Sequence, residues 1–114
     1  MNEKKTLYLV WTNADLITSK LMVFMYGINA KTKGWWENVT IVIWGATAKL
    51  VSENTEIQEY IKKAQTEGVH VSACITCANE LGVADKLEAL DIELIRWGAP
   101  LTELLKNDEA ILTI

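Results

Sequence analysis

The sequence predicts a single α/β domain in which a mainly parallel, five-stranded sheet lies between two layers of helices. Short β-branched and apolar runs alternate along the chain with segments of helical periodicity, and this alternation is typical of parallel sheets joined by right-handed crossovers. The length of 114 residues suits one domain, since a chain of this size buries roughly two-thirds of its unfolded surface on folding. We therefore expect one three-layer domain over residues 1–114, without a linker or an internal repeat.

The first third of the chain predicts a strand, a long helix and a second strand. Thr6 to Trp11 is a buried strand, a helix follows over residues 15–29, and the second strand runs from Val39 to Trp44. The predicted sheet-facing residues of the helix are Ile17, Leu21, Phe24, Met25 and Ile28. Other apolar residues lie elsewhere on this helix, so we expect a neighbouring subunit or a neighbouring helix to cover a second apolar face.

The middle of the chain predicts a short connector, an amphipathic helix and a third strand. The connector covers Ala46 to Val51 and forms about one helical turn. The helix starts near Asn54 and stops at Gly68, because glycine readily takes the left-handed conformation that ends a helix. The third strand follows over residues 69–73.

The last third predicts two short helices, a strand, a third helix and a final strand. These elements are residues 75–81, residues 83–90, Ile92 to Arg96, a helix opened by Gly98-Ala99-Pro100, and Ala110 to Ile114. Proline suits the first turn of a helix, where its missing N–H group has no partner to lose.

Both cysteines of the chain lie at one predicted strand-to-helix junction. Cys74 and Cys77 fall in the first turn of the helix, where free backbone N–H groups and the helix dipole favour a thiolate. In a reducing cytoplasm a Cys-x-x-Cys pair indicates redox, sulfur or metal chemistry before it indicates a structural disulfide. The alternative is that two buried thiols merely pack in the core.

The predicted site is the edge of the sheet where the parallel strands end, since ligands bind there in such sheets. The residues at this edge are Trp11 with Asn13, Trp44 with Gly45, Cys74, and Arg96 with Trp97. They predict an aromatic-walled pocket around Cys74, unless the tryptophans simply close the core.

Lowering a thiol pKa by about two units takes roughly 2.7 kcal/mol, more than a helix dipole contributes. Lys49 and Arg96 are the candidate cations that would supply the remainder.

The net charge and the residue composition exclude several other classes of protein and of binding site. The net charge is −4, from 15 acidic and 11 basic residues, and the basic residues form no phosphate-binding cluster, so we expect no nucleic-acid partner. No apolar run is long enough to span a membrane or serve as a signal peptide, which predicts a soluble cytoplasmic protein. Two cysteines and His70 are too few for a structural zinc site unless it is built across subunits, and the first strand is followed by no dinucleotide fingerprint. We therefore expect neither a metal nor a cofactor.

Three local patterns carry a resemblance to a known family. They are the Trp44-Gly45-Ala46 turn, the helix closed by Gly68-Val69, and the motif Ala-Cys74-x-x-Cys77-Ala-x-x-x-Gly82-Val83. The chain resembles the DsrE/DsrF-like family of the DsrEFH superfamily, which contains small sulfur-relay and uncharacterised proteins.

This resemblance implies a function for one cysteine. In the sulfur-relay members a persulfide-carrying cysteine stands eight residues before the corresponding Gly-Val, and Cys74 stands eight before Gly82. The resemblance also implies a sulfurtransferase-like carrier that forms homo- or hetero-oligomers, commonly trimers or hexamers, with a homo-oligomer expected here, and a sulfur donor or acceptor protein as partner. It further implies that the third strand lies inside the sheet and the last strand near an edge.

Three functions remain as hypotheses. The first is a sulfur-relay protein that carries a persulfide on Cys74, with Cys77 either resolving it as a disulfide or idle. The second is a non-catalytic oligomeric module that binds a small ligand in the tryptophan-lined pocket. The third is a thiol-disulfide redox protein that uses both cysteines.

Overall fold

The computed structural model describes residues 4–114, and residues 1–3 of the predicted domain lie outside the described part. One sheet contains all five strands in the order β4-β3-β2-β1-β5, and every neighbouring pair is parallel. The predicted α/β class is therefore confirmed, and the sheet is wholly rather than mainly parallel. The third strand lies inside the sheet and the fifth at an edge, as the resemblance implied.

The elements follow one another closely along the chain. The strands are β1 (Thr6–Trp11), β2 (Asn38–Ile43), β3 (His70–Cys74), β4 (Glu93–Ile95) and β5 (Ala110–Thr113). The helices are α1 (Leu16–Thr18), the π-helical segment η1 (Ser19–Phe24), α2 (Met25–Thr32), α3 (Ala46–Glu53), α4 (Thr55–Thr66), α5 (Ile75–Glu80), α6 (Ala84–Ala89) and α7 (Gly98–Lys106). The main difference from prediction is α3, an eight-residue helix where a shorter connector was expected.

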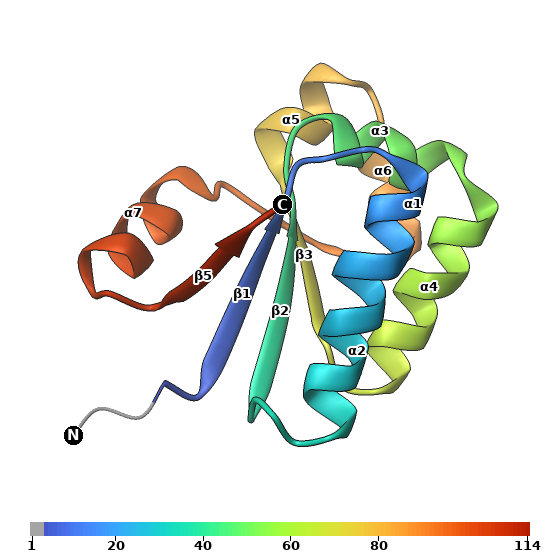
Figure 1. Ribbon diagram of the computed structural model, residues 1–114. Coiled ribbons are helices and arrows are strands. Elements are labelled where there is room, and N and C mark those ends of the chain that lie inside the picture. The colour runs from blue at the N-terminus through green and yellow to red at the C-terminus, as the bar shows by residue number, and fades with distance from the viewer. Residues whose placement is uncertain (1–3) are drawn as a thin grey trace.

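The two faces of the sheet are covered unequally. From β1 through β2 and β3 to β4 the chain moves in one direction, so right-handed crossovers place α1 to α6 on one face. The connection from β4 to β5 returns across the whole sheet, and α7 lies on the opposite face (Figure 1). No residue of α7 is buried. The predicted third layer is therefore a single, loosely packed helix.

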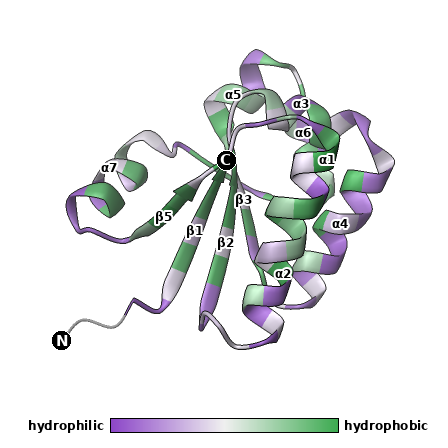
Figure 2. Cartoon of the chain, in the orientation of Figure 1, coloured by the Kyte–Doolittle hydropathy of each residue, from purple (hydrophilic) through white to green (hydrophobic). Residues whose placement is uncertain are grey.

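The core lies between the sheet and the layer that contains α4. Figure 2 shows mostly hydrophobic residues along the strands, whereas α4 alternates between hydrophilic and hydrophobic residues. Large side chains without solvent exposure include Leu9, Ile41, Ile43, Ile57 and Ile61. Each side chain of this size contributes about 1.5–3 kcal/mol when it is removed from water.

None of the helices within residues 4–114 combines the length and apolar character that a membrane crossing requires.

The first helix faces the sheet with a different stripe from the predicted one. Phe24 and Ile28 are buried as expected, but Ile17, Leu21 and Met25 are 67 %, 57 % and 52 % exposed. The prediction was wrong for these three residues. They form an outward stripe that no other element within residues 4–114 covers.

Small side chains share the buried surface of this helix with Val23, Phe24 and Ile28. Ser19, Gly27 and Ala30 are buried in η1 and α2. A Cβ atom at Gly27 would lie 3.0 Å from Leu9 Cδ1, so the absence of a side chain lets the helix approach β1 closely. A search for apolar periodicity gives no weight to glycine or serine and therefore misses this stripe.

Candidate functional site

The two thiols lie at the junction of β3 and α5. Cys74 is the last residue of β3 and the N-cap of α5, and Cys77 is the third residue of that helix. Both cysteines are free. Side chains alternate between the faces of a strand: Val71 and Ala73 belong to the core under the helices, which directs Ser72 and Cys74 to the face that carries α7.

A pocket of about 530 Å³ opens beside the cysteines, and its lining residues are Trp44, Cys74, Thr76, Cys77, Arg96, Trp97, Gly98 and Ala99. They come from the ends of β2, β3 and β4 and from the starts of α5 and α7. Because neighbouring parallel strands end at the same edge, residues far apart in the chain meet there. The structure thus brings Trp44, Arg96 and Trp97 together around the cysteine pair.

The turn after β2 is bonded to the turn after β3. The Gly45 backbone N–H donates a hydrogen bond to Cys77 Sγ over 3.4 Å. Gly45 has a φ angle of +71°, which a glycine adopts without steric cost. This conformation presents the N–H group to the sulfur, so Gly45 joins the site through its backbone.

Burial sets the protonation behaviour of Cys77. The partly buried position raises the pKa of the Cys77 thiol, and the hydrogen bond from Gly45 opposes this rise. A hydrogen bond with Cys74 and a negative charge on Cys74 each raise the Cys77 pKa further. The net pKa shift is upward, so Cys77 retains its proton as a thiol at neutral pH.

A buried hydrogen-bond chain fixes Trp97. Trp97 Nε1–H donates to Ser72 Oγ over 2.8 Å, and Ser72 Oγ–H donates to Glu93 Oε1 over 2.9 Å. Ser72 and Glu93 are direct partners in the β3–β4 register, which places them on one face. The same Glu93 oxygen lies 3.2 Å from His70 Nε2. The His70 side chain is about half exposed, and His70 is not among the residues that line the pocket.

Sequence reasoning missed Ser72 and Glu93. The available signal was the polar Ser72 inside an otherwise apolar buried strand, since a buried hydroxyl indicates a hydrogen-bond partner. The identity of that partner depends on strand order and register, which the residue pattern alone does not provide.

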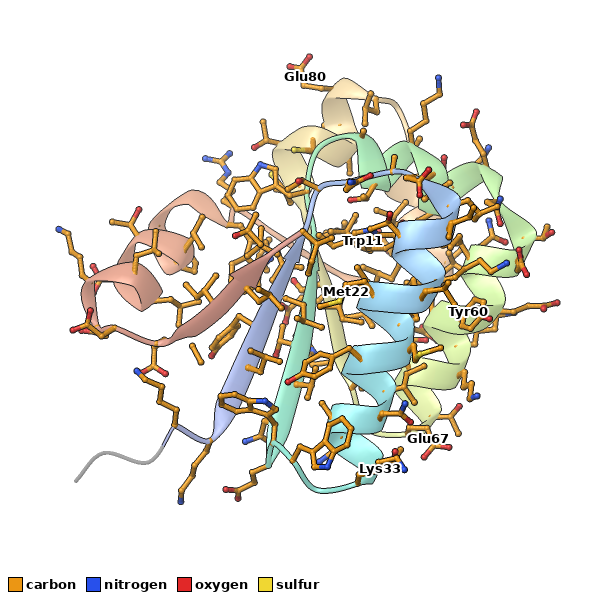
Figure 3. All side chains as sticks on the ribbon, in the orientation of Figure 1. Trp11, Met22, Lys33, Tyr60, Glu67 and Glu80 are labelled. Carbon is orange, nitrogen blue, oxygen red and sulfur yellow. The ribbon has the colours of Figure 1, made fainter. Side chains whose placement is uncertain are left out.

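Two residues predicted at the site lie elsewhere. Trp11 is fully buried and lies at the end of β1 beside the first helix (Figure 3). Its Nε1–H reaches both Ser19 Oγ and the Asn13 carbonyl oxygen over 3.0 Å. Asn13 Oδ1 accepts a hydrogen bond from the Asp15 backbone N–H. The reason is strand order: β2 lies between β1 and β3, so the end of β1 does not reach the cysteines.

The two candidate cations have different positions. Lys49 is an exposed residue of α3 and is not part of the pocket lining. Arg96 follows β4 directly and lines the pocket. Among residues 4–114, no group of three or more His, Cys, Asp or Glu side chains is arranged to hold a metal ion.

Two solved structures are similar to this chain. The conserved protein of unknown function BT1422 from Bacteroides thetaiotaomicron matches with a TM-score of 0.94 and 39 % sequence identity, over 96 % of this chain and 95 % of that one. The YchN protein from E. coli matches with a TM-score of 0.71 and 15 % identity, over 98 % of this chain and 100 % of that one. The second likeness shows a shared fold alone. No family model and no curated protein matches the chain.

Proposed function

This chain belongs to the same family as the conserved Bacteroides thetaiotaomicron protein of unknown function, and from that premise we propose that it is a sulfur-relay protein that carries a persulfide on Cys74. The observation that supports this most directly is the pair of free thiols in the wall of one open pocket. The fold shared with YchN and the DsrE/DsrF-like motif around Cys74 favour the same function. Free thiols also fit a reducing compartment such as the cytoplasm.

The chemistry is a transfer of one sulfur atom between thiols. The Cys74 thiolate attacks the outer sulfur of a donor persulfide, R–S–SH. A sulfur-sulfur bond forms at Cys74 as the bond in the donor breaks, and the donor leaves as the thiolate R–S⁻. An acceptor thiolate then attacks the outer sulfur of the Cys74 persulfide in the same way, so the relay needs no external oxidant.

The surroundings of the two sulfurs suit different roles for Cys74 and Cys77. Cys77 has a raised pKa, so Cys77 keeps its proton, and we assign the role of nucleophile to Cys74. Cys74 is only 5 % exposed and meets solvent through the pocket. A partly enclosed site limits side reactions of a reactive intermediate, such as loss of the persulfide to other thiols.

Intact mass spectrometry of the native protein tests this function. After treatment with a sulfane-sulfur donor, we expect a gain of one sulfur, about 32 Da, that a reductant removes. The gain of mass should be absent in Cys74→Ser and should persist in Cys77→Ser, the matched control. Uptake that persists in Cys74→Ser, or no uptake by any variant, would refute the proposal. A loss of two hydrogens in place of uptake would instead indicate a thiol-disulfide redox protein.

We further propose that the protein is a homo-oligomer, with a trimer or hexamer as the expected size. The outward stripe of Ile17, Leu21 and Met25 supports this, because monomers rarely leave large contiguous apolar surfaces in water. Light scattering after size-exclusion chromatography measures the mass of the particle. The mass of a single 12.8 kDa chain would contradict the proposal.

A further inference from the structure

We propose that the pocket binds a low-molecular-weight sulfur donor that carries a carboxylate, and that Arg96 recognises this carboxylate. The inference rests on the proposed sulfur-relay function and specifies the class of its donor. It concerns a small thiol persulfide rather than the tail of a donor protein.

The composition of the pocket indicates a small, mostly apolar ligand with one anionic group. The lining includes two tryptophans, Trp44 and Trp97, and Thr76 contributes a hydroxyl. Arg96 is the single lining residue with a permanent charge, and no acidic residue lines the pocket. The volume of about 530 Å³ lies within the range of roughly 300–1,000 Å³ that is typical of small-molecule sites.

Arg96 is available for an anionic ligand. It is the only arginine of the chain, and within residues 4–114 no carboxylate forms an ion pair with it and no side-chain hydrogen bond occupies it. The planar guanidinium fork matches the two oxygens of a carboxylate, which a lysine ammonium does not. A carboxylate in the pocket would therefore find an unpaired cation of matching shape.

The strand register places this cation close to the reacting sulfur. Cys74 pairs with Ile95, and Arg96 is the next residue along the chain. Neighbouring strands lie about 4.8 Å apart, so the two residues leave the sheet side by side, and both line the same pocket. A donor of amino-acid size, which carries a sulfur and a carboxylate in one molecule, suits a pocket lined by both.

The wall against which the ligand's carbon atoms pack is rigid. Trp97 is 5 % exposed, and its indole N–H is held by Ser72, which in turn is held by Glu93. The residues that follow it, Gly98 and Ala99, are small and leave the pocket open. A preorganised wall lowers the entropic cost of binding.

The reaction remains balanced with such a donor. The Cys74 thiolate attacks the outer sulfur of the donor persulfide, the sulfur-sulfur bond of the donor breaks, and the donor leaves as its thiolate. Arg96 contacts only the carboxylate, so its role is to bind and position the donor.

Two donors that differ in a single group provide the test: the persulfide of N-acetylcysteine and the persulfide of N-acetylcysteine amide. Time-resolved mass spectrometry gives the rate of Cys74 loading with each. We expect loading to be about tenfold faster with the carboxylate donor, the size typical of one charge-assisted hydrogen bond. Arg96→Gln should abolish this preference and Arg96→Lys should retain part of it. Lys49→Gln, a cation outside the pocket, is the matched control and should leave it unchanged.

A binding measurement separates this inference from the relay function. In a Cys74→Ser/Cys77→Ser variant, which transfers no sulfur, N-acetylcysteine should shift the NMR signal of the Trp97 indole N–H, and its amide should not. Equal loading rates with both donors, or a preference that survives in Arg96→Gln, would overturn the carboxylate site even if Cys74 still takes up sulfur. Selective shifts that depend on Arg96, without sulfur uptake by the wild type, would support the site and refute the relay.

Discussion

Replacing Ser72 by alanine tests the hydrogen-bond chain that fixes the tryptophan wall. Ser72 has no solvent exposure, and its Oγ atom accepts the only side-chain hydrogen bond that the Trp97 indole N–H donates. The substitution leaves the Trp97 donor buried without a partner. Glu93 also loses a bond, but its side chain is 45 % exposed, so water replaces the lost contact there.

The expected cost follows from the buried donor. An unsatisfied N–H group costs about 1–3 kcal/mol, and we expect Ser72→Ala to lower the free energy of unfolding by about 2 kcal/mol. With a urea m-value of about 2 kcal/mol/M, the midpoint of unfolding moves down by about 1 M.

A double-mutant cycle with Trp97→Phe isolates the contact. Phenylalanine has no N–H group, so in that background the loss of the Ser72 hydroxyl leaves no unsatisfied donor. We expect a coupling free energy of about 1–2 kcal/mol between the two positions, measured by urea unfolding. If Ser72→Ala costs the same with Trp97 as with phenylalanine, the hydrogen bond contributes nothing and the reasoning is wrong.

Three further predictions concern the cysteine turn and a helix cap. Burial raises the pKa of Cys77, and Cys74 adds to the rise. Alkylation of Cys77 should therefore require a more alkaline pH than alkylation of a small thiol in solution. Cys74→Ser should move the pH profile of Cys77 alkylation toward lower pH. Gly45→Ala should cost about 1–3 kcal/mol in urea unfolding, because φ +71° with ψ −132° is a conformation that side chains rarely adopt. Gly82→Ala, at φ +69°, should also lower stability yet leave Cys77 alkylation unchanged. Hydrogen bonds from backbone N–H groups at the start of α1 lower the pKa of Asp15 below its ordinary value of 3.8. The ionised Asp15 therefore stabilises the fold above pH 3.8, and this stabilisation is lost as the pH falls through the lower pKa of the folded state. The difference in unfolding free energy between wild type and Asp15→Ala should therefore vanish in acid.

The site was predictable where it depends on a general property of parallel sheets. The ends of neighbouring parallel strands meet at one edge, so Trp44, Arg96 and Trp97 could be grouped with Cys74 before the strand order was known. Trp11 ends a strand as well, but β2 separates β1 from the cysteines. Two acceptors within reach of its indole N–H then allow this ring to be fully buried.

The first helix was harder to predict because small residues determine its packing. Gly27 is buried against β1 for lack of a side chain, whereas Leu21 and Met25 point away from the sheet. Apolar periodicity identified the helix correctly but oriented it by its largest side chains. The π-helical turn over Ser19–Phe24 has no signal in residue type, because it depends on backbone hydrogen bonds that shift by one residue.

The order of the strands has a consequence for synthesis of the chain on the ribosome. β1 is made first, yet its second neighbour is β5, which pairs Leu7 with Ala110. Before β5 is added, β2, β3 and β4 can assemble beside β1, but one edge of β1 stays open. An unpaired edge with apolar side chains is a template for pairing with another chain. Until β5 is added, β1 therefore offers another chain an edge to pair with, and pairing with β5 removes that edge.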